Sequence, residues 1–237
     1  MGKTLKINEI FESISGEAGF IPQGAWTTFI RLQKCNLSCK ECDTKHSQES
    51  GGLEMSIDAI IQRVKHFDNN NVLITGGEPL YQLNTDTLII ELIKLGYFTQ
   101  IETNGSIAPA MLQESLMPEI RNIHYIFDHK TPSSGMSIKM PDAEQFVINM
   151  YDYPSMVKFV IKDENDAKFS IQKTIELYRA GFTGYFIFSP AGADKDLLTD
   201  YKTCKFSLLN FWKAHCPGFI KSRTIFSLQI HKLVNLS

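Results

Sequence analysis

The sequence contains no hydrophobic run long enough to cross a membrane, because a spanning helix needs about 20 consecutive apolar residues. It also has no excess of basic residues: the formal net charge is −2, whereas proteins that bind nucleic acids are more often basic. The N-terminus has no apolar signal core, and Lys6 breaks the myristoylation pattern. These absences predict a cytoplasmic protein with no membrane partner and no direct nucleic-acid partner. In that reducing compartment, Cys204 and Cys216 are expected to be structural thiols.

Cysteine is scarce, and three of the five cysteines form a C-x3-C-x2-C pattern at Cys35, Cys39 and Cys42. An odd number at this spacing does not suit a set of disulfides, and it lets three sulfurs converge on a soft metal centre. A cubane iron–sulfur cluster usually takes four thiolates, so three would leave one iron open to a substrate or cofactor. Two alternatives stay open here: a zinc site completed by His46, and a group of unligated core cysteines.

Strand-like and helix-like segments alternate about six times along the chain. Strands are predicted at 6–14, 27–32, 71–75, 99–103, 123–127, 156–161, 184–188 and near 224–228. Helices are predicted at 56–67, 85–95, 110–116, 143–150, 167–179 and 208–215. This alternation is typical of parallel βαβ units, and the strand count favours a partial, open (β/α)6 barrel over a full barrel of eight. The length favours one domain over residues 1–237.

The less ordinary residues come directly after predicted strands. They are the three cysteines, Gly76-Gly77-Glu78-Pro79, Asn104-Gly105, Asp128-His129-Lys130 and Ser189-Pro190. The carboxyl ends of parallel strands form the ligand-binding face of a barrel or sheet, so these segments should meet there. In the GGEP turn, two glycines would let a ligand approach the backbone, and the Glu78 carboxylate could accept from a cationic amine.

The cysteine pattern, followed one βα unit later by GGEP, resembles the radical S-adenosylmethionine (SAM) superfamily. The resemblance implies a TIM-like partial barrel that holds a [4Fe–4S] cluster on the three cysteines and SAM on the open iron. The reduced cluster would cleave SAM to a 5′-deoxyadenosyl radical that abstracts a hydrogen atom. It also implies an electron donor such as flavodoxin or ferredoxin. The SAM contacts that it implies are Glu41, Cys42, Asp43, Gly77, Glu78, Asp128, His129, Lys130, Phe188, Ser189 and Pro190.

Further segments resemble a single family within that superfamily, the 7-carboxy-7-deazaguanine synthases. They are FESISGEAG at 11–19, FIRL at 29–32, CDT at 42–44, IETNG at 101–105, KTPSSGM at 130–136 and QIHK at 229–232. The resemblance runs from about residue 8 to 233. It implies a homodimeric lyase that converts 6-carboxy-5,6,7,8-tetrahydropterin into 7-carboxy-7-deazaguanine with loss of ammonia. This ring contraction leads to 7-deazapurine nucleosides such as queuosine.

The chemistry of this reaction suggests roles for particular residues. The substrate carboxylate needs a guanidinium, which Arg31 offers at a strand end. By resemblance, Thr44 is the protein ligand of a Mg2+ ion that substrate oxygens help to coordinate. The other implied substrate contacts are Ile14, Ser15, Gly16, Glu17, Thr75 and His231. Alternative roles are weighed for these residues: Arg31 as a surface cation, Thr44 as a capping hydroxyl and Glu17, taken alone, as a solvated loop charge.

Several positions depart from the family pattern: Ser15 replaces a usual Gln, Ala18 a Gly, Asp128-His129 a Ser-Pro pair and Leu228 a Pro. These changes bear on the affinity for SAM and pterin more than on the type of reaction. Two other functions are weighed against a synthase. A glycyl-radical activase acts on a protein and would not need Arg31, Glu17 and Thr44 around one small site. A zinc-stabilised binding module would leave the GGEP turn unexplained.

Overall fold

The computed structural model describes residues 2–49, 51–110, 119–150, 153–191 and 208–230. Their strands are β1 (Thr4–Ile14), β2 (Trp26–Leu32), β3 (Leu53–Ser56), β4 (Asn71–Gly76), β5 (Phe98–Thr103), β6 (Ile123–Asp128), β7 (Ser155–Ile161), β8 (Tyr185–Pro190) and β9 (Thr224–Phe226). They form one sheet in the order β3-β1-β2-β4-β5-β6-β7-β8-β9. β1 is antiparallel to both of its neighbours, and every pairing from β2 to β9 is parallel.

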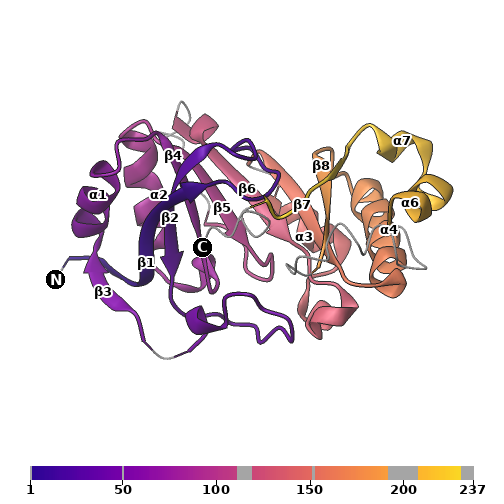
Figure 1. Ribbon diagram of the computed structural model, residues 1–237, viewed down its shortest axis with the longest axis horizontal. Helices are drawn as coiled ribbons and strands as arrows, with labels where there is room; N and C mark the ends of the chain where they lie inside the picture. The colour runs from indigo at the N-terminus through magenta and orange to yellow at the C-terminus, as the bar shows by residue number, and fades with distance from the viewer. Residues whose placement is uncertain (1, 50, 111–118, 151–152, 192–207, 231–237) are drawn as a thin grey trace.

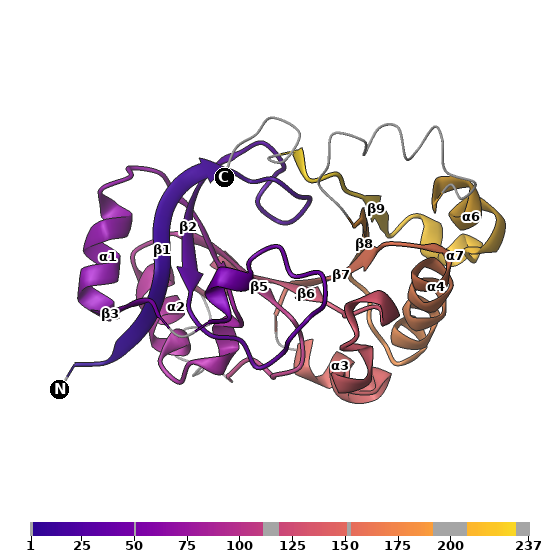
Figure 2. The ribbon, with the colours of Figure 1, turned by 60° about the horizontal axis from the view of Figure 1, so that its bottom comes forward.

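The sheet curves into an open trough with helices on its outer side (Figures 1 and 2). The helices are α1 (Ile57–Lys65), α2 (Thr85–Lys94), α3 (Ala143–Met150), α4 (Glu164–Arg179), α6 (Leu208–His215) and α7 (Gly218–Lys221). Among the described strands, β3 and β9 are the two edges and do not pair with each other, so the barrel stays open. The predicted partial, open barrel of βα units is therefore confirmed.

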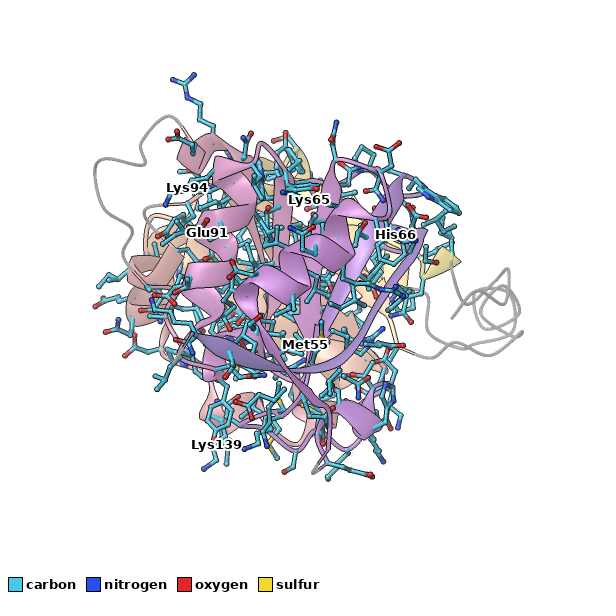
Figure 3. All side chains as sticks on the ribbon, turned by 90° about the vertical axis from the view of Figure 1, so that its left-hand side faces the viewer. Met55, Lys65, His66, Glu91, Lys94 and Lys139 are labelled. Carbon is cyan, nitrogen blue, oxygen red and sulfur yellow. The ribbon has the colours of Figure 1, made fainter. Side chains whose placement is uncertain are left out.

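Helix α1 illustrates why these segments are helical. The Ser56 hydroxyl accepts from the Ala59 amide at 3.2 Å and so caps the first turn. The buried residues recur at helical spacing and face the sheet: Ile57, Ile60, Ile61 and Val64. Figure 3 looks onto this side of the molecule, with Lys65 and His66 at the end of α1 and Glu91 and Lys94 on α2. Glu91 and Lys94 form an ion pair at 3.2 Å.

Side chains on the parallel strands alternate between the helix layer and the inside of the trough. On β7, Val157 and Phe159 join the main hydrophobic core, whereas Lys158 and Val160 line a cavity on the other face. On β6, Phe127 is in the core and Asp128 lines the same cavity. This period of two determines which residues at the strand ends reach the inside of the trough.

The predicted elements differ from the structure mainly at their ends. Strand β3 was not predicted, because it is a short edge strand that lacks a strong apolar pattern and is held by pairing with β1. Helix α4 begins at Glu164 rather than at residue 167, because Asp163 accepts from the Asp166 amide at 2.9 Å and caps it. Strand β9 ends at Phe226 rather than 228. The predicted helix at 110–116 lies almost wholly outside the described residues.

Candidate active site

A cavity of about 660 Å³ opens inside the trough, at the carboxyl ends of the parallel strands. It is bordered by the segment at 14–17 and the cysteine loop, and by residues at the ends of β2, β4, β5, β6, β7 and β8. The prediction that these strand-end segments meet on one face is confirmed for the cysteine loop, Gly77, Asn104, Asp128 and Lys130. The trough thus brings together residues that are far apart in the sequence.

The cysteine loop leaves the end of β2 and forms one wall of the cavity. Its three cysteines are partly buried free thiols that line the cavity: Cys35, Cys39 and Cys42. The loop is fixed by backbone hydrogen bonds from Lys34 N to Ser47 O at 2.7 Å and from Lys40 N to Ser134 O at 3.0 Å. Burial raises the pKa of the Cys35 and Cys39 thiols. Metal binding must therefore displace their protons, as thiolate ligation requires.

The arrangement of these thiols bears on the kind of metal they can hold. Within the described residues, no three His, Cys, Asp or Glu side chains are grouped as the ligands of a single metal ion would be. His46 also lines the cavity. A [4Fe–4S] cluster binds each thiolate through a different iron atom, so its ligands need not meet at one point. Three free thiols that line one cavity are the residues that would hold it.

The GGEP turn is packed against the backbone of the cysteine loop. The Gly77 amide donates to Leu32 O at 3.0 Å, and the Glu78 amide donates to Lys34 O at 2.8 Å. A Cβ atom on Gly77 would lie 1.8 Å from Lys34 O, and one on Gly76 would lie 2.2 Å from Leu32 O. Both positions therefore need glycine mainly because two protein segments approach each other closely there, and not because a ligand approaches. Gly77 also lines the cavity, as expected of a SAM contact.

Glu78 does not line the cavity, contrary to the expected contact with a SAM amine. Its side chain is fully buried, and its carboxylate accepts from Leu80 N at 2.9 Å, Thr103 Oγ1 at 2.7 Å and Asn104 N at 2.7 Å. Burial raises the pKa of Glu78, although the hydrogen bonds from these donors act to lower it. The carboxylate joins the GGEP turn to the end of β5 and the loop after it, because one donor comes from the turn and two come from Thr103 and Asn104.

At the end of β6, the predicted run of three SAM contacts is split by strand alternation. Asp128 and Lys130 line the cavity and form an ion pair at 3.0 Å. His129 is 1% exposed and packs among aromatic rings on the helix side, with centroids 5.0 Å from Phe146 and 5.5 Å from Phe159. Burial lowers the pKa of His129 to about 4, so the ring is neutral. Its side chain does not line the cavity, and the expected SAM contact of this residue stays a prediction.

The segment at the end of β8 also differs from expectation. Phe188 belongs to the helix-side core, with its ring centroid 4.3 Å from that of Trp212 and 5.5 Å from that of Phe159. Neither Ser189, which is 1% exposed, nor Pro190 lines the cavity. Their predicted side-chain contacts with SAM are therefore not supported, and Ala191 is the residue of this segment that reaches the cavity.

Six of the expected substrate residues line the same cavity. Those that line it are Ile14, Ser15, Gly16, Glu17, Arg31 and Thr75. The Arg31 side chain is 15% exposed, pairs through Nε with Glu9 at 2.6 Å and lies 5.6 Å from the Phe11 ring centroid. It is therefore a cation of the cavity rather than of the outer surface. His231 lies outside the described residues.

Thr44 lies where the cysteine loop meets the cavity. Its Oγ1 is 3.6 Å from Cys42 Sγ and makes no capping hydrogen bond to the short helix that follows, so the capping interpretation is not supported. Glu41 and Asp43 line the cavity beside it, and Glu41 pairs with Lys162. Cys216, expected to be structural, is buried in the main core.

Several polar residues that line the cavity were not among the predicted site residues, and they include Glu102, Lys158 and Gln229. Lys158 Nζ lies 2.7 Å from Glu17 Oε2, and Gln229 Nε2 donates to Glu17 Oε1. Glu17 is thus a buried ion-pair partner and not a solvated loop charge. A signal existed for Lys158, since it is the one charged residue in the buried-type strand SMVKFVI.

Comparisons with known proteins agree with this geometry. A sequence profile of the Radical SAM superfamily matches residues 29–133, which implies a [4Fe–4S] cluster and SAM. The 7-carboxy-7-deazaguanine synthase of Thermoplasma acidophilum is 33% identical over 201 residues, covering 82% of this chain and 87% of that protein. The enzyme of the same name from Halobacterium salinarum is 34% identical over 175 residues, covering 70% and 67%.

The fold has a counterpart among solved structures. The crystal structure of QueE from Escherichia coli superposes with a TM-score of 0.65 at 20% identity, covering 95% of this chain and 94% of that one. At this identity the match supports the fold alone. The sequence relationship goes further, because it extends over most of both chains at 33% identity. With the cysteine loop, the GGEP turn and the open barrel in agreement, the chain belongs to the 7-carboxy-7-deazaguanine synthase family of radical SAM enzymes.

Proposed function

We propose that this enzyme converts 6-carboxy-5,6,7,8-tetrahydropterin into 7-carboxy-7-deazaguanine with release of ammonia, and that residues 1–237 act as one domain. The observation that supports this most directly is the lining of the cavity. The same cavity is lined by the three thiols, by a guanidinium, Arg31, and by a fixed carboxylate, Glu17. A small molecule with an anionic carboxylate at one end and an amino edge at the other would complement both groups.

The residues of the chain would bind and orient the reactants. When bound, the cluster and SAM supply a 5′-deoxyadenosyl radical able to abstract a hydrogen atom. Arg31 would bind the substrate carboxylate, and Glu17 with the backbone of 14–16 would accept from the amino edge of the pterin. Asp128 and Lys130, which line the cavity near the cysteine loop, would contact SAM. Turnover of the carboxy-tetrahydropterin with SAM and a strong reductant, assayed without oxygen, tests the reaction, and failure to form the deazaguanine contradicts it.

The remaining expectations stay predictions. They are a flavodoxin or ferredoxin as electron donor, a homodimer, and a cytoplasmic location. The part of the chain that the structure describes has no helix both long and apolar enough to span a membrane. A protein substrate, as for a glycyl-radical activase, is less well suited to a cavity of about 660 Å³ that is lined by charged side chains of both signs.

Replacing Arg31 by lysine is expected to weaken pterin binding by roughly tenfold or more while leaving SAM binding nearly unchanged. Lysine keeps the positive charge but loses the planar fork that matches a carboxylate. Dissociation constants of both ligands, measured by titration of the reconstituted enzyme, test this. Arg63→Lys, on the exposed face of α1, is the matched control. Equal losses for both ligands would remove the assignment of Arg31 to the substrate.

Thr44→Ala is expected to blunt the response of activity to added Mg2+, if Thr44 Oγ1 is the protein ligand of that ion. Mg2+ prefers six oxygen ligands and binds few protein groups when a substrate supplies others. The measurement is the turnover rate against Mg2+ concentration, with Thr44→Ser as the variant that keeps the hydroxyl. An alanine variant with an unchanged rate and unchanged Mg2+ dependence would show that the hydroxyl is not a ligand.

A further inference from the structure

We infer that Lys158 is a positioning residue for the substrate-binding residue Glu17. It holds the Glu17 carboxylate in one orientation and one charge state, so that Glu17 accepts from the amino edge of the substrate. The inference rests on the proposed function, in which Glu17 is the acceptor for the pterin. It adds a residue of β7 to a site that the motifs locate only in the β1–β2 loop, the strand ends and the C-terminal segment.

The geometry fixes both oxygens of Glu17. Lys158 Nζ lies 2.7 Å from Oε2, with side-chain exposures of 8% for Lys158 and 14% for Glu17. The amide of Gln229, from the C-terminal segment, donates to Oε1. The Ala18 amide donates to Ser227 Oγ at 2.8 Å, and the Ile230 amide donates to Gly16 O at 2.9 Å. Glu17 is therefore held both by β7 and by the C-terminal segment. Its carboxylate is already oriented to accept a hydrogen bond before a pterin binds.

Lys158 also balances the charge of Glu17 among the other charged groups of the cavity. The other charged or titratable groups that line this cavity, besides the three cysteines, are Glu9 on β1, Arg31 on β2, Glu41, Asp43 and His46 on the segment after β2, Glu102 on β5, Asp128 and Lys130 at the end of β6, Lys162 after β7 and Asp166 on α4. Arg31 pairs with Glu9 at 2.6 Å, and Lys130 pairs with Asp128 at 3.0 Å. Lys158 is thus the cation that pairs with Glu17 in the part of the chain that the structure describes. It also lies beside Asp128 in the register of β6 and β7.

The electrostatics follow from this arrangement. Burial alone would raise the pKa of Glu17, but the charge and hydrogen bond of Lys158, with the bond from Gln229, hold it below its usual value. Burial would lower the pKa of Lys158, but Glu17, Glu102 and Asp128 together hold it well above its usual value. Lys158 therefore stays charged and Glu17 stays a carboxylate throughout the physiological range. A protonated Glu17 would present a donor where the pterin amino edge needs an acceptor.

Lys158→Met tests this because it keeps the length of the side chain and removes the charge. Without the cation, burial and Asp128 raise the pKa of Glu17, so Glu17 takes up a proton as the pH falls toward neutrality. We expect pterin binding to be roughly 10- to 100-fold weaker than in the wild type at about pH 6.5, the loss shrinking as the pH rises toward about 9. Lys158→Arg keeps the charge and should restore most of the affinity.

The probe is 6-carboxypterin, a fluorescent oxidised form of the substrate, titrated into anaerobically reconstituted enzyme that contains SAM. Each variant is compared with the wild type at the same pH, so that titration of the probe itself cancels. Lys168→Met is the matched control, because Lys168 is exposed on α4 and pairs with Glu164 at 2.8 Å. It should bind the probe like the wild type at every pH.

A double-mutant cycle separates positioning from general packing. If Lys158 acts through Glu17, Lys158→Met should change the affinity little once Glu17→Gln is present. The double variant also removes both charges of the buried pair, so its fold should survive. Wild-type affinity of Lys158→Met at every pH, or a loss that does not vary with pH and persists in the Glu17→Gln background, would overturn the inference. Absence of probe binding by the wild type would instead count against the proposed function.

Discussion

Replacing any one of Cys35, Cys39 and Cys42 by alanine is expected to abolish the visible absorbance of the reconstituted cluster and all turnover. All three thiols line one cavity, and the chain offers no spare thiol there among its described residues. A three-thiolate site that loses one ligand has two left, while the open iron is needed for SAM. Iron and sulfide content, together with the absorption spectrum after anaerobic reconstitution, measures the loss directly.

Cys216→Ala is the matched control for this experiment. Cys216 is buried in the main core, and burial raises the pKa of its thiol to about 11, so it is an inert thiol. The variant should keep full iron content and turnover, at a cost in stability of about 1 kcal/mol. Cys204→Ala, outside the described residues, should also keep both. A variant of Cys204 that lost the cluster would show that the ligand assignment is wrong, and zinc in place of iron and sulfide would favour a binding module.

The sequence was sufficient to predict the fold because its signals are local. Strands β4 and β7 are short, largely apolar runs, and α1 carries its cap and its apolar face within about ten residues. The meeting of the strand ends follows from the parallel order alone, without knowledge of any single contact. The predicted positions of the cysteine loop, Gly77, Asp128 and Lys130 on one cavity depended only on that rule.

The orientation of some predicted SAM contacts was not foreseen. His129 and Phe188 were grouped with their neighbours, although side chains alternate along a strand and at its end. Phe127 on β6 faces the core under the helices. The alternation then indicates that Asp128 faces the inside of the trough and that His129 faces the helix layer. The same alternation, applied to Ile101, would have revealed Glu102 on the cavity side. Counting the alternation of side chains along each strand would therefore have predicted which of these side chains face the cavity.

Other features could not be predicted from local patterns. Lys158 and Glu17 are 141 residues apart, and nothing near either one indicates its partner. The sequence predicts that Glu78 accepts from a ligand. Its donors instead come from its own turn and from Thr103 and Asn104 at the end of β5, which lie 25 and 26 residues further along the chain. Pairings of this kind are decided by which strand ends are adjacent in the folded sheet.

Gly77→Ala is expected to have the second large effect, on both the stability and the cluster. Its Cβ would lie 1.8 Å from Lys34 O and 2.9 Å from Cys35 N, both backbone atoms that no side-chain rotation can move away. The GGEP turn or the start of the cysteine loop must therefore shift. That shift would break the hydrogen bonds from Gly77 N to Leu32 O and from Glu78 N to Lys34 O. Overpacking of this kind costs about 3 kcal/mol or more when the backbone has to move.

The thermal midpoint and the iron content of the Gly77→Ala enzyme should therefore fall together, because the same backbone segment carries Cys35 and packs against the turn. Gly218→Ala is the matched control: a Cβ there would meet nothing within 4 Å, at the first residue of helix α7. That variant should be neutral or more stable by about 0.5 kcal/mol, since alanine restricts the unfolded chain. A lower midpoint with full iron content would mean that the turn only supports the fold. An unchanged midpoint with lost SAM affinity would mean that Gly77 serves the ligand alone and that the close packing against Lys34 relaxes without cost.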